Sequence, residues 1–140
     1  MIVVDTNVLA YLFLTSEQST QAEQALRRDP EWAAPFLWRS EFRNVLAHYL
    51  RRELLSLQEA GAIMDAATGL MRGREYQVVS HRVLDLAAAS TCSAYDCEFV
   101  ALAQDLGVPL VTAGRKILQE FADVAVPLAD FVSPGRSPQP

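Results

Sequence analysis

Short apolar runs alternate with helical patterns along this chain, and the alternation constrains the fold more than any other feature. The candidate strands lie at 2–4, 33–36, 77–79, 109–111 and 124–128. Helical patterns lie at about 6–13, 17–28, 38–52, 56–72, 81–90, 94–106 and 115–121. This order predicts an α/β domain with a mainly parallel central sheet of about five strands. Ligands of open α/β sheets bind beyond the carboxyl ends of the strands, so residues at those ends are the first candidates for a site.

The length of 140 residues suits one domain with a substantial core, which we assign to 1–132. The remaining segment, 133–140, reads SPGRSPQP and is predicted to be disordered because it is rich in Pro and polar residues. The net charge of −5 argues against a protein that coats nucleic acid through its overall field. Eleven of the twelve cations are Arg, however, and Arg suits local recognition of phosphate.

The N-terminal sequence MIVVDTNVLAYLFL lacks a basic region and meets an acid at Asp5, so it does not resemble a signal peptide. No apolar run approaches the roughly 20 residues that span a bilayer. The two cysteines, Cys92 and Cys97, have no Cys or His cluster around them, and we interpret them as free thiols of a reducing cytosol. Together these features predict a cytoplasmic protein without a membrane segment.

Asp5 directly follows the first apolar run and therefore stands at the carboxyl end of the expected first strand. One interpretation is a cap for the helix that follows, because Asp is a preferred residue at that position. The triplet Asp5-Thr6-Asn7 favours another interpretation, since it places three oxygen-bearing side chains at one strand end. Both interpretations remain open from the sequence.

Glu41 lies in the helical segment FLWRSEFRNVLAHYL. An apolar stripe runs along this helix at about 100° per residue and consists of Trp38, Phe42, Val45 and Tyr49. Glu41 falls on the flank of the stripe, beside Asn44 and His48. A boundary glutamate, or an acid favoured near a helix N-terminus by the macrodipole, would explain this position as well as a functional site does.

Of the three acids, Asp96 has the predicted orientation that most favours a functional site. In the helix AYDCEFVALAQDL it projects between Phe99 and Ala103, inside the apolar arc. The residues assigned to the opposite, solvated side are Glu98, Gln104 and Asp105. A capping box with Ser93 would explain an acid at this position but not its inward direction.

Three inward carboxylates are costly to desolvate and would repel one another unless a cation lies between them. That cation would be either an Arg or Lys side chain or a divalent metal. All candidate ligands are hard oxygens, and His48 and His81 do not stand at ligand spacing. Mg²⁺ or Mn²⁺ is therefore favoured over Zn²⁺.

Three segments in this order and spacing resemble the PIN-domain family: VVDTNVLAYLF, LWRSEFRNVLAHYL and SAYDCEFVALAQDLGVPLVTAGRKIL. Within the family the likeness is to the VapC-type toxins of toxin–antitoxin pairs, and it extends over about residues 1–128. The resemblance implies a three-layer α/β/α fold and a Mg²⁺- or Mn²⁺-dependent endoribonuclease. It also implies an RNA substrate, a cognate antitoxin protein that covers the cleft, and a homodimer.

Carried over by position, Asp5 matches the first acid of the family, Glu41 the second and Asp96 the third. The resemblance makes these acids the catalytic and metal-binding residues, with Asp5 and Asp96 as direct ligands and Glu41 as a ligand or a holder of water. The side chains expected to orient them are those of Thr6, Asn7 and Thr112. The candidates for phosphate contacts, which would otherwise be solvated surface charges, are Arg39, Arg43, Arg115 and Lys116.

The resemblance breaks at VTAGRK. The family typically has an aspartate two residues after the threonine that closes the fourth strand, and here Gly114 takes that position after Thr112. With one carboxylate fewer, we expect one metal rather than two, held more weakly. The same glycine supports the main alternative, a non-catalytic PIN-like binding module with an incomplete acid site.

Two unrelated classes share parts of the pattern. Phosphotransferases of the haloacid-dehalogenase type need an acid two residues after the first Asp, where this chain has Asn7. Receiver-like signalling domains need an acidic pair after the first strand and an Asp after the strand at 77–79, where this chain has Ser80. These positions argue against both classes.

Overall fold

The computed structural model describes residues 1–134, in which a parallel sheet lies between two layers of helices. The strands are β1 (Ile2–Val4), β2 (Trp32–Pro35), β3 (Glu75–Tyr76), β4 (Leu110–Thr112) and β5 (Ala125–Pro127). The helices are α1 (Thr6–Phe13), α2 (Ser19–Arg28), α3 (Leu37–Arg51), α4 (Leu57–Met71), α5 (Ser80–Ala88), α6 (Ala94–Leu106), α7 (Arg115–Glu120) and α8 (Leu128–Phe131). The five strands have the order β3-β2-β1-β4-β5, and every neighbouring pair is parallel. The predicted three-layer α/β/α fold is confirmed.

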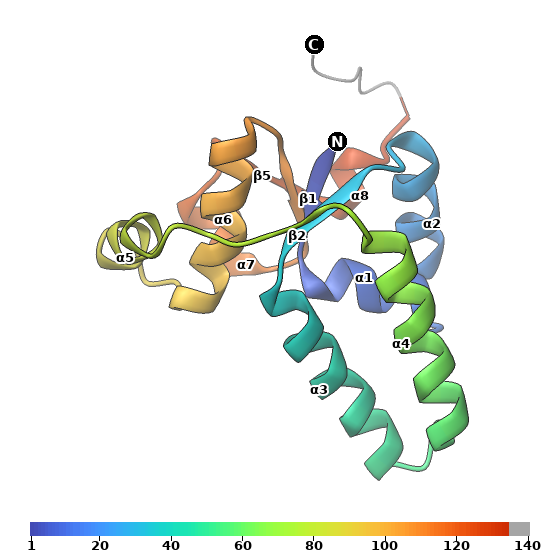
Figure 1. Cartoon of the computed structure of the whole chain (residues 1–140). Coiled ribbons are helices and arrows are strands. Elements are labelled where there is room, and N and C mark those ends of the chain that lie inside the picture. The colour runs from blue at the N-terminus through green and yellow to red at the C-terminus, as the bar shows by residue number, and fades with distance from the viewer. Residues whose placement is uncertain (135–140) are drawn as a thin grey trace.

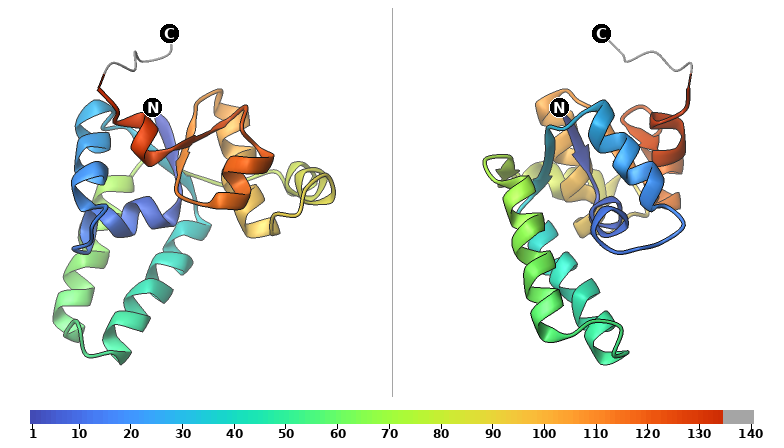
Figure 2. Two further views of the ribbon diagram at one scale, coloured as in Figure 1. Left: turned by 180° about the vertical axis from the view of Figure 1, so that it is seen from behind. Right: turned by 90° about the vertical axis from the view of Figure 1, so that its right-hand side faces the viewer.

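The helices divide between the two faces of the sheet. Figure 1 shows α5, α6 and α7 on one side of the strands and α1, α2, α4 and α8 on the other. Helix α6 packs against β1, β2 and β4, whereas α8 packs against α2, β4 and β5. Figures 1 and 2 also show α3 and α4 as an antiparallel pair that extends beyond the sheet.

Strand β1 occupies the centre of the sheet, and all three of its residues are buried. A strand covered by helices on both faces needs apolar side chains in both directions, which explains the unbroken run from Ile2 to Val4. The chain runs from β1 to β2 on one side but pairs β1 with β4 on the other. This reversal of strand order places a crevice beyond the carboxyl ends of β1 and β4.

The seven helices predicted from periodicity are all present, with ends within two residues of the expected positions. One helix end has an identifiable backbone cause. Gly107 ends α6 with a φ of 66°, a left-handed conformation that glycine adopts without a steric penalty. The chain then passes through Val108 and Pro109 into β4.

The third strand was predicted at the wrong position. It comprises Glu75–Tyr76, pairs with Ala34 and Pro35, and ends before the predicted segment 77–79. Arg74 fixes this part of the chain, because its Nε donates to the carbonyl of Trp32 at 2.9 Å. Val79 is 55% exposed and serves as the residue before α5 rather than as strand.

The end of the sheet also differs from the expectation. The strand predicted at 124–128 is the shorter β5, and the short helix α8, which was not predicted, begins at Leu128 directly after Pro127. The predicted disordered tail, 133–140, lies outside the described residues from 135 onward.

Two further predictions concern the chain as a whole. Cys92 and Cys97 are both buried free thiols, as expected. Within residues 1–134, no helix is long and apolar enough to cross a membrane.

Candidate active site

Asp5 lies at the carboxyl end of β1, where both of its carboxylate oxygens accept hydrogen bonds. Oδ1 accepts from the backbone N–H of Val8 at 3.1 Å and so caps α1. Oδ2 accepts from the hydroxyl of Thr112 at the end of β4. Burial raises the pKa of Asp5, and the bonds from Thr112 and Val8 offset part of that rise. Asp5 is therefore the predicted cap of α1 and is also held at the switch point of the sheet.

Glu41 reaches the same strand end from α3. The hydroxyl of Thr6 donates to Glu41 Oε1 at 2.7 Å, so the residue that follows Asp5 holds the second acid. Burial raises the pKa of Glu41, and the negative charges of Asp96 and Asp5 raise it further. Glu41 is therefore the acid on which the charges of the other two act.

Asp96 lies in the first turn of α6 and is half-buried. The Oγ of Ser93 accepts a hydrogen bond from the backbone N–H of Asp96 at 3.0 Å, so Ser93 caps the helix as expected. In the described part of the chain, the reciprocal bond that completes a capping box occurs in α4, between Ser56 and Glu59. The Asp96 carboxylate instead lines a pocket.

The three acids line one pocket of about 260 Å³. Its other lining residues are Thr6, Asn7, Asn44, Val45, Phe99 and Ile117. Thr112 lies behind Asp5 and is fully buried. No residue of this lining is Lys or Arg, so the pocket itself supplies no cation to neutralise the acids. Carboxylate, hydroxyl and amide oxygens are the ligands that Mg²⁺ and Mn²⁺ prefer.

The acids do not form a closed cluster. Among residues 1–134, no three His, Cys, Asp or Glu side chains stand close enough together to hold a metal ion. Two of the acids instead bond to different hydroxyls, Glu41 to that of Thr6 and Asp5 to that of Thr112. The donor set of the lining is of the kind that suits a divalent cation, whereas the carboxylates as they stand do not form a closed metal site.

Gly114, where the sequence departs from the family, has ordinary backbone angles, with φ at −76° and ψ at 119°. Its N–H donates to Thr112 Oγ1 at 3.0 Å. A Cβ at this position would lie 3.4 Å from Thr112 Oγ1 and 3.6 Å from Ile117 Cδ1, which are ordinary contact distances. Neither the backbone nor the available space requires a glycine here.

The arginines predicted on α3 do not line the pocket. Arg39 forms a two-pronged bond with Glu75, with Nε to Oε2 at 2.6 Å and Nη2 to Oε1 at 2.7 Å. Arg43 donates from its Nε to the carbonyl of Arg39 at 3.0 Å. Each lies two positions from Glu41, which is about 200° around a helix. The predicted cations on α7, Arg115 and Lys116, do not line the pocket either; they are exposed residues that directly precede the pocket residue Ile117 in the chain.

Sequence reasoning gave no role to several residues near the site. Asn44 lines the pocket one helical turn after Glu41, and that i, i+3 spacing was the available signal. Glu98 was assigned to solvent but is half-buried, and burial raises its pKa. Tyr11 has a pKa raised by burial and by the charge of Asp5. No periodicity in α1 or α6 predicts these last two environments.

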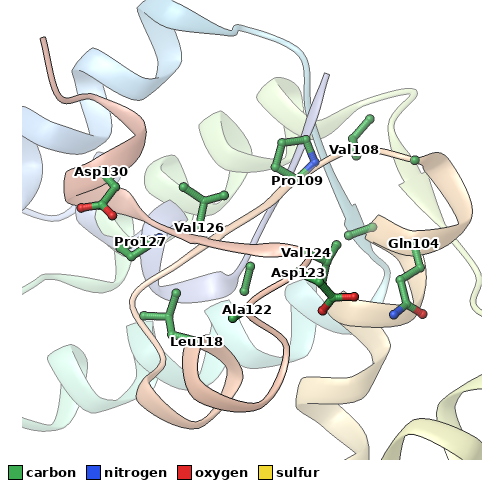
Figure 3. A pocket seen from close by; sticks show the side chains of 13 residues that line it. Gln104, Val108, Pro109, Leu118, Ala122, Asp123, Val124, Val126, Pro127 and Asp130 are labelled. Carbon is green, nitrogen blue, oxygen red and sulfur yellow. The ribbon is translucent and has the colours of Figure 1, made fainter. Parts of the chain in front are cut away.

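A larger hollow of about 820 Å³ lies alongside β5 and shares no lining residue with the acid pocket. Figure 3 shows Asp123 and Gln104 together on one part of its rim and Asp130 apart from them. Its lining brings no two of the predicted site residues together. Of these two pockets, the smaller is the one that the predicted site residues line.

Known proteins match this chain over most of its length. The family model of the PIN domain matches residues 2–125. Ribonuclease VapC3 of Pyrobaculum aerophilum is 30% identical over 129 residues, which span 90% of this chain and 98% of that protein.

Solved structures share the fold at lower identity. The PAE2754 protein of Pyrobaculum aerophilum has a TM-score of 0.70 and 19% identity, covering 94% of this chain and 92% of that one. A chain of a toxin–antitoxin complex from Klebsiella pneumoniae has a TM-score of 0.65 and 20% identity, covering 91% of this chain and 98% of that one. The sequence match and the shared architecture agree: the chain belongs to the PIN-domain family, and within it is similar to a VapC ribonuclease.

Proposed function

We propose that this protein is a Mg²⁺- or Mn²⁺-dependent endoribonuclease and the toxin of a VapBC-type toxin–antitoxin pair. The observation that carries the proposal is the convergence of Asp5, Glu41 and Asp96 on one pocket whose lining contains no Lys or Arg. The relative at 30% identity is a ribonuclease by name, which supports RNA as the substrate.

In this proposal Asp5 and Asp96 bind the cation directly, and Glu41 is a third ligand or holds a water. Thr112 fixes the orientation of the Asp5 carboxylate, and Thr6 fixes that of Glu41. A bound divalent cation supplies a water of lowered pKa for in-line attack and neutralises charge that develops on the phosphate. Because no fourth carboxylate stands at Gly114, we favour one cation over two.

Other side chains at the pocket suit contacts with RNA. Asn7 is exposed and lines the pocket, so its amide can donate to a phosphate or ribose oxygen as well as support the acids. Arg115 and Lys116 stand at the start of α7, directly before the pocket residue Ile117, and in this proposal they contact a phosphate group. Arg39 and Arg43 would meet RNA only outside the pocket.

The partners follow from the family resemblance. A structural neighbour comes from a toxin–antitoxin complex, which supports an antitoxin partner for this chain. An acidic pocket without its own cation suits a basic side chain of such a partner. A homodimer, a cytoplasmic location and a catalytic domain spanning 1–132 belong to the same proposal, and the two free thiols fit a reducing compartment.

The alternative is a non-catalytic PIN-like binding module, and the observation that favours it is the missing fourth acid at Gly114. Incubation of purified protein with RNA and Mn²⁺ separates the two functions. The variants are Asp96→Asn and a matched control on the same helix, Asp105→Asn, which lies outside the pocket and is exposed.

We expect the wild type and Asp105→Asn to cleave RNA alike. Asp96→Asn should be slower by about 100-fold or more, since it removes a charge that positions the catalytic cation. Equal inactivity of wild type and Asp96→Asn, with no Mn²⁺ binding, would refute the nuclease and leave the binding module.

A further inference from the structure

Helix α7 is bonded through Glu120 to the loop that precedes α6, which carries Asp96, and its first end is tied to the Asp5 side. The N–H of Gly114, directly before α7, donates to Thr112 Oγ1 at 3.0 Å. Thr112 in turn donates to the Asp5 carboxylate. Ile117 of α7 is buried and lines the acid pocket. The start of α7 is therefore anchored to the strand end that holds the first acid.

The last residue of α7, Glu120, holds the loop that precedes α6. Its Oε1 accepts from the N–H of Thr91 at 3.0 Å, and its Oε2 accepts from the Thr91 hydroxyl at 2.6 Å. Oε2 also lies 3.5 Å from Cys92 Sγ, which donates to it. The Nζ of Lys116 donates to the carbonyl of Thr91 at 3.4 Å. One short helix thus engages the N–H, the hydroxyl and the carbonyl of a single loop residue.

That loop residue leads directly to the third acid. Thr91 stands two positions before Ser93, the cap of α6, and Ser93 Oγ accepts from the backbone N–H of Asp96 at 3.0 Å. Farther along, α6 is fixed by a run of core residues from Phe99 to Ala103. In the first turn Cys97 is buried in the core, whereas Ala94 is exposed and Tyr95 is 62% exposed, so this turn is packed on one side only.

We propose that Glu120 is a positioning residue, which holds the loop at Thr91 and thereby the first turn of α6 so that Asp96 faces Asp5 across the pocket. The physical reason is that hydrogen bonds tie α7 at its start to Thr112, which bonds to Asp5, and at its end to Thr91, which precedes α6 and Asp96. This inference deepens the proposed metal-dependent function and rests on it, although Glu120 itself touches neither the acids nor the substrate.

The test compares Glu120→Ala and the milder Glu120→Gln with a matched control, Glu59→Ala. Glu59 is also an exposed glutamate that accepts a backbone N–H, from Ser56 at 2.9 Å, but it lies at the start of α4, away from the pocket. Two quantities are measured in each protein: the dissociation constant for Mn²⁺, and amide hydrogen exchange at Asp96 and Cys97 without metal. Thermal unfolding shows that each variant is folded.

We expect Glu120→Ala to weaken Mn²⁺ binding by about tenfold, the lower end of the effect of groups that orient metal ligands. It should also speed exchange at the Asp96 and Cys97 amides, and Glu120→Gln, which keeps one acceptor oxygen, should fall between it and the wild type. Glu59→Ala should leave both quantities unchanged. If Glu120→Ala and Glu120→Gln match the wild type in both, Glu120 does not position Asp96.

Failure of the proposed function gives a different result. A wild type that binds no Mn²⁺ would remove the metal site, yet hydrogen exchange in the metal-free protein would still decide whether Glu120 holds the first turn of α6. Faster exchange confined to that turn supports the positioning role, and unchanged exchange refutes it.

Discussion

The hydroxyl of Thr112 donates a hydrogen bond to the carboxylate of Asp5, joining two residues 107 positions apart in the chain. The bond connects the carboxyl ends of β4 and β1, the two strands between which the order of the sheet reverses. The Oγ of Thr112 also accepts from the N–H of Gly114. One buried hydroxyl therefore fixes the first acid and the backbone of the position where the family's fourth acid is missing.

Replacement of that hydroxyl should destabilise the protein. Thr112→Val keeps the volume of the side chain but removes the hydroxyl that bonds to Asp5 Oδ2 and to the Gly114 N–H, while Asp5 Oδ1 keeps its bond from Val8. We expect a loss of about 1–3 kcal/mol in the free energy of unfolding, measured by urea denaturation at neutral pH. Thr112→Ser, which retains the hydroxyl, is the control. A Thr112→Val protein as stable as the wild type would show that the bond contributes nothing to the fold.

The acid pocket should reduce stability when no metal is present. Because the pKa of Glu41 is raised in the folded state, the folded protein binds this proton more tightly than the unfolded chain, whose pKa is near 4.5. Stability is therefore lost as the pH rises from about 4.5 through the raised pKa. Glu41→Gln removes that loss and keeps an oxygen for Thr6. In EDTA the variant should unfold at a higher temperature than the wild type at neutral pH.

The pH dependence makes this prediction specific. The advantage of Glu41→Gln should shrink as the pH falls and vanish below about 4.5, where Glu41 is protonated in both states. The control is Glu23→Gln, an exposed glutamate of α2. A Glu41→Gln variant that is less stable than the wild type at neutral pH would contradict the electrostatic account.

Restoration of a carboxylate at position 114 should strengthen metal binding. Gly114 has backbone angles and space that accept a side chain, and an Asp there would stand at the cap of α7 beside Thr112. We expect Gly114→Asp to bind Mn²⁺ more tightly on the order of tenfold. The variant Gly114→Asn has the same shape without the charge. Equal Mn²⁺ affinity in wild type and Gly114→Asp would count against a fourth ligand position.

The arginines should separate into a structural and a substrate-binding class. The bond with Arg39 holds the pKa of Glu75 below its ordinary value, so Arg39→Ala should lower the unfolding temperature with little effect on RNA affinity. Arg115→Ala should weaken RNA binding with little effect on the unfolding temperature. It should also reduce the slope of log affinity against log salt concentration by about 1. RNA affinity and unfolding temperature are measured for each arginine variant in the Asp96→Asn background. Equal losses of RNA affinity would contradict the assignment.

Elements fixed by local pattern could be predicted from the sequence, and β1 is the clearest case. A strand buried on both faces reads as a continuous apolar run, so the predicted 2–4 and the observed bounds coincide. The inward direction of Asp96 likewise follows from helical geometry and its apolar neighbours. These inferences need no knowledge of distant contacts.

Elements fixed by distant side chains could not be predicted in the same way. The short strand β3 is held by Glu75, which accepts from Trp38 Nε1 at 2.7 Å and from Arg39, both on α3. The apolar run that follows it looked more like a strand, although Val79 faces solvent. The burial of Glu98 depends in the same way on what packs against α6, which periodicity within the helix does not contain.

The central claim is that Asp5, Glu41 and Asp96 hold a divalent cation. Direct titration of Mn²⁺, monitored by electron paramagnetic resonance, tests this claim without reference to activity. The account predicts one bound Mn²⁺ per wild-type chain, unchanged binding in Asp105→Asn, and binding weakened by about tenfold or more in Asp96→Asn. Absence of Mn²⁺ binding in the wild type, or equal affinity in wild type and Asp96→Asn, would contradict it.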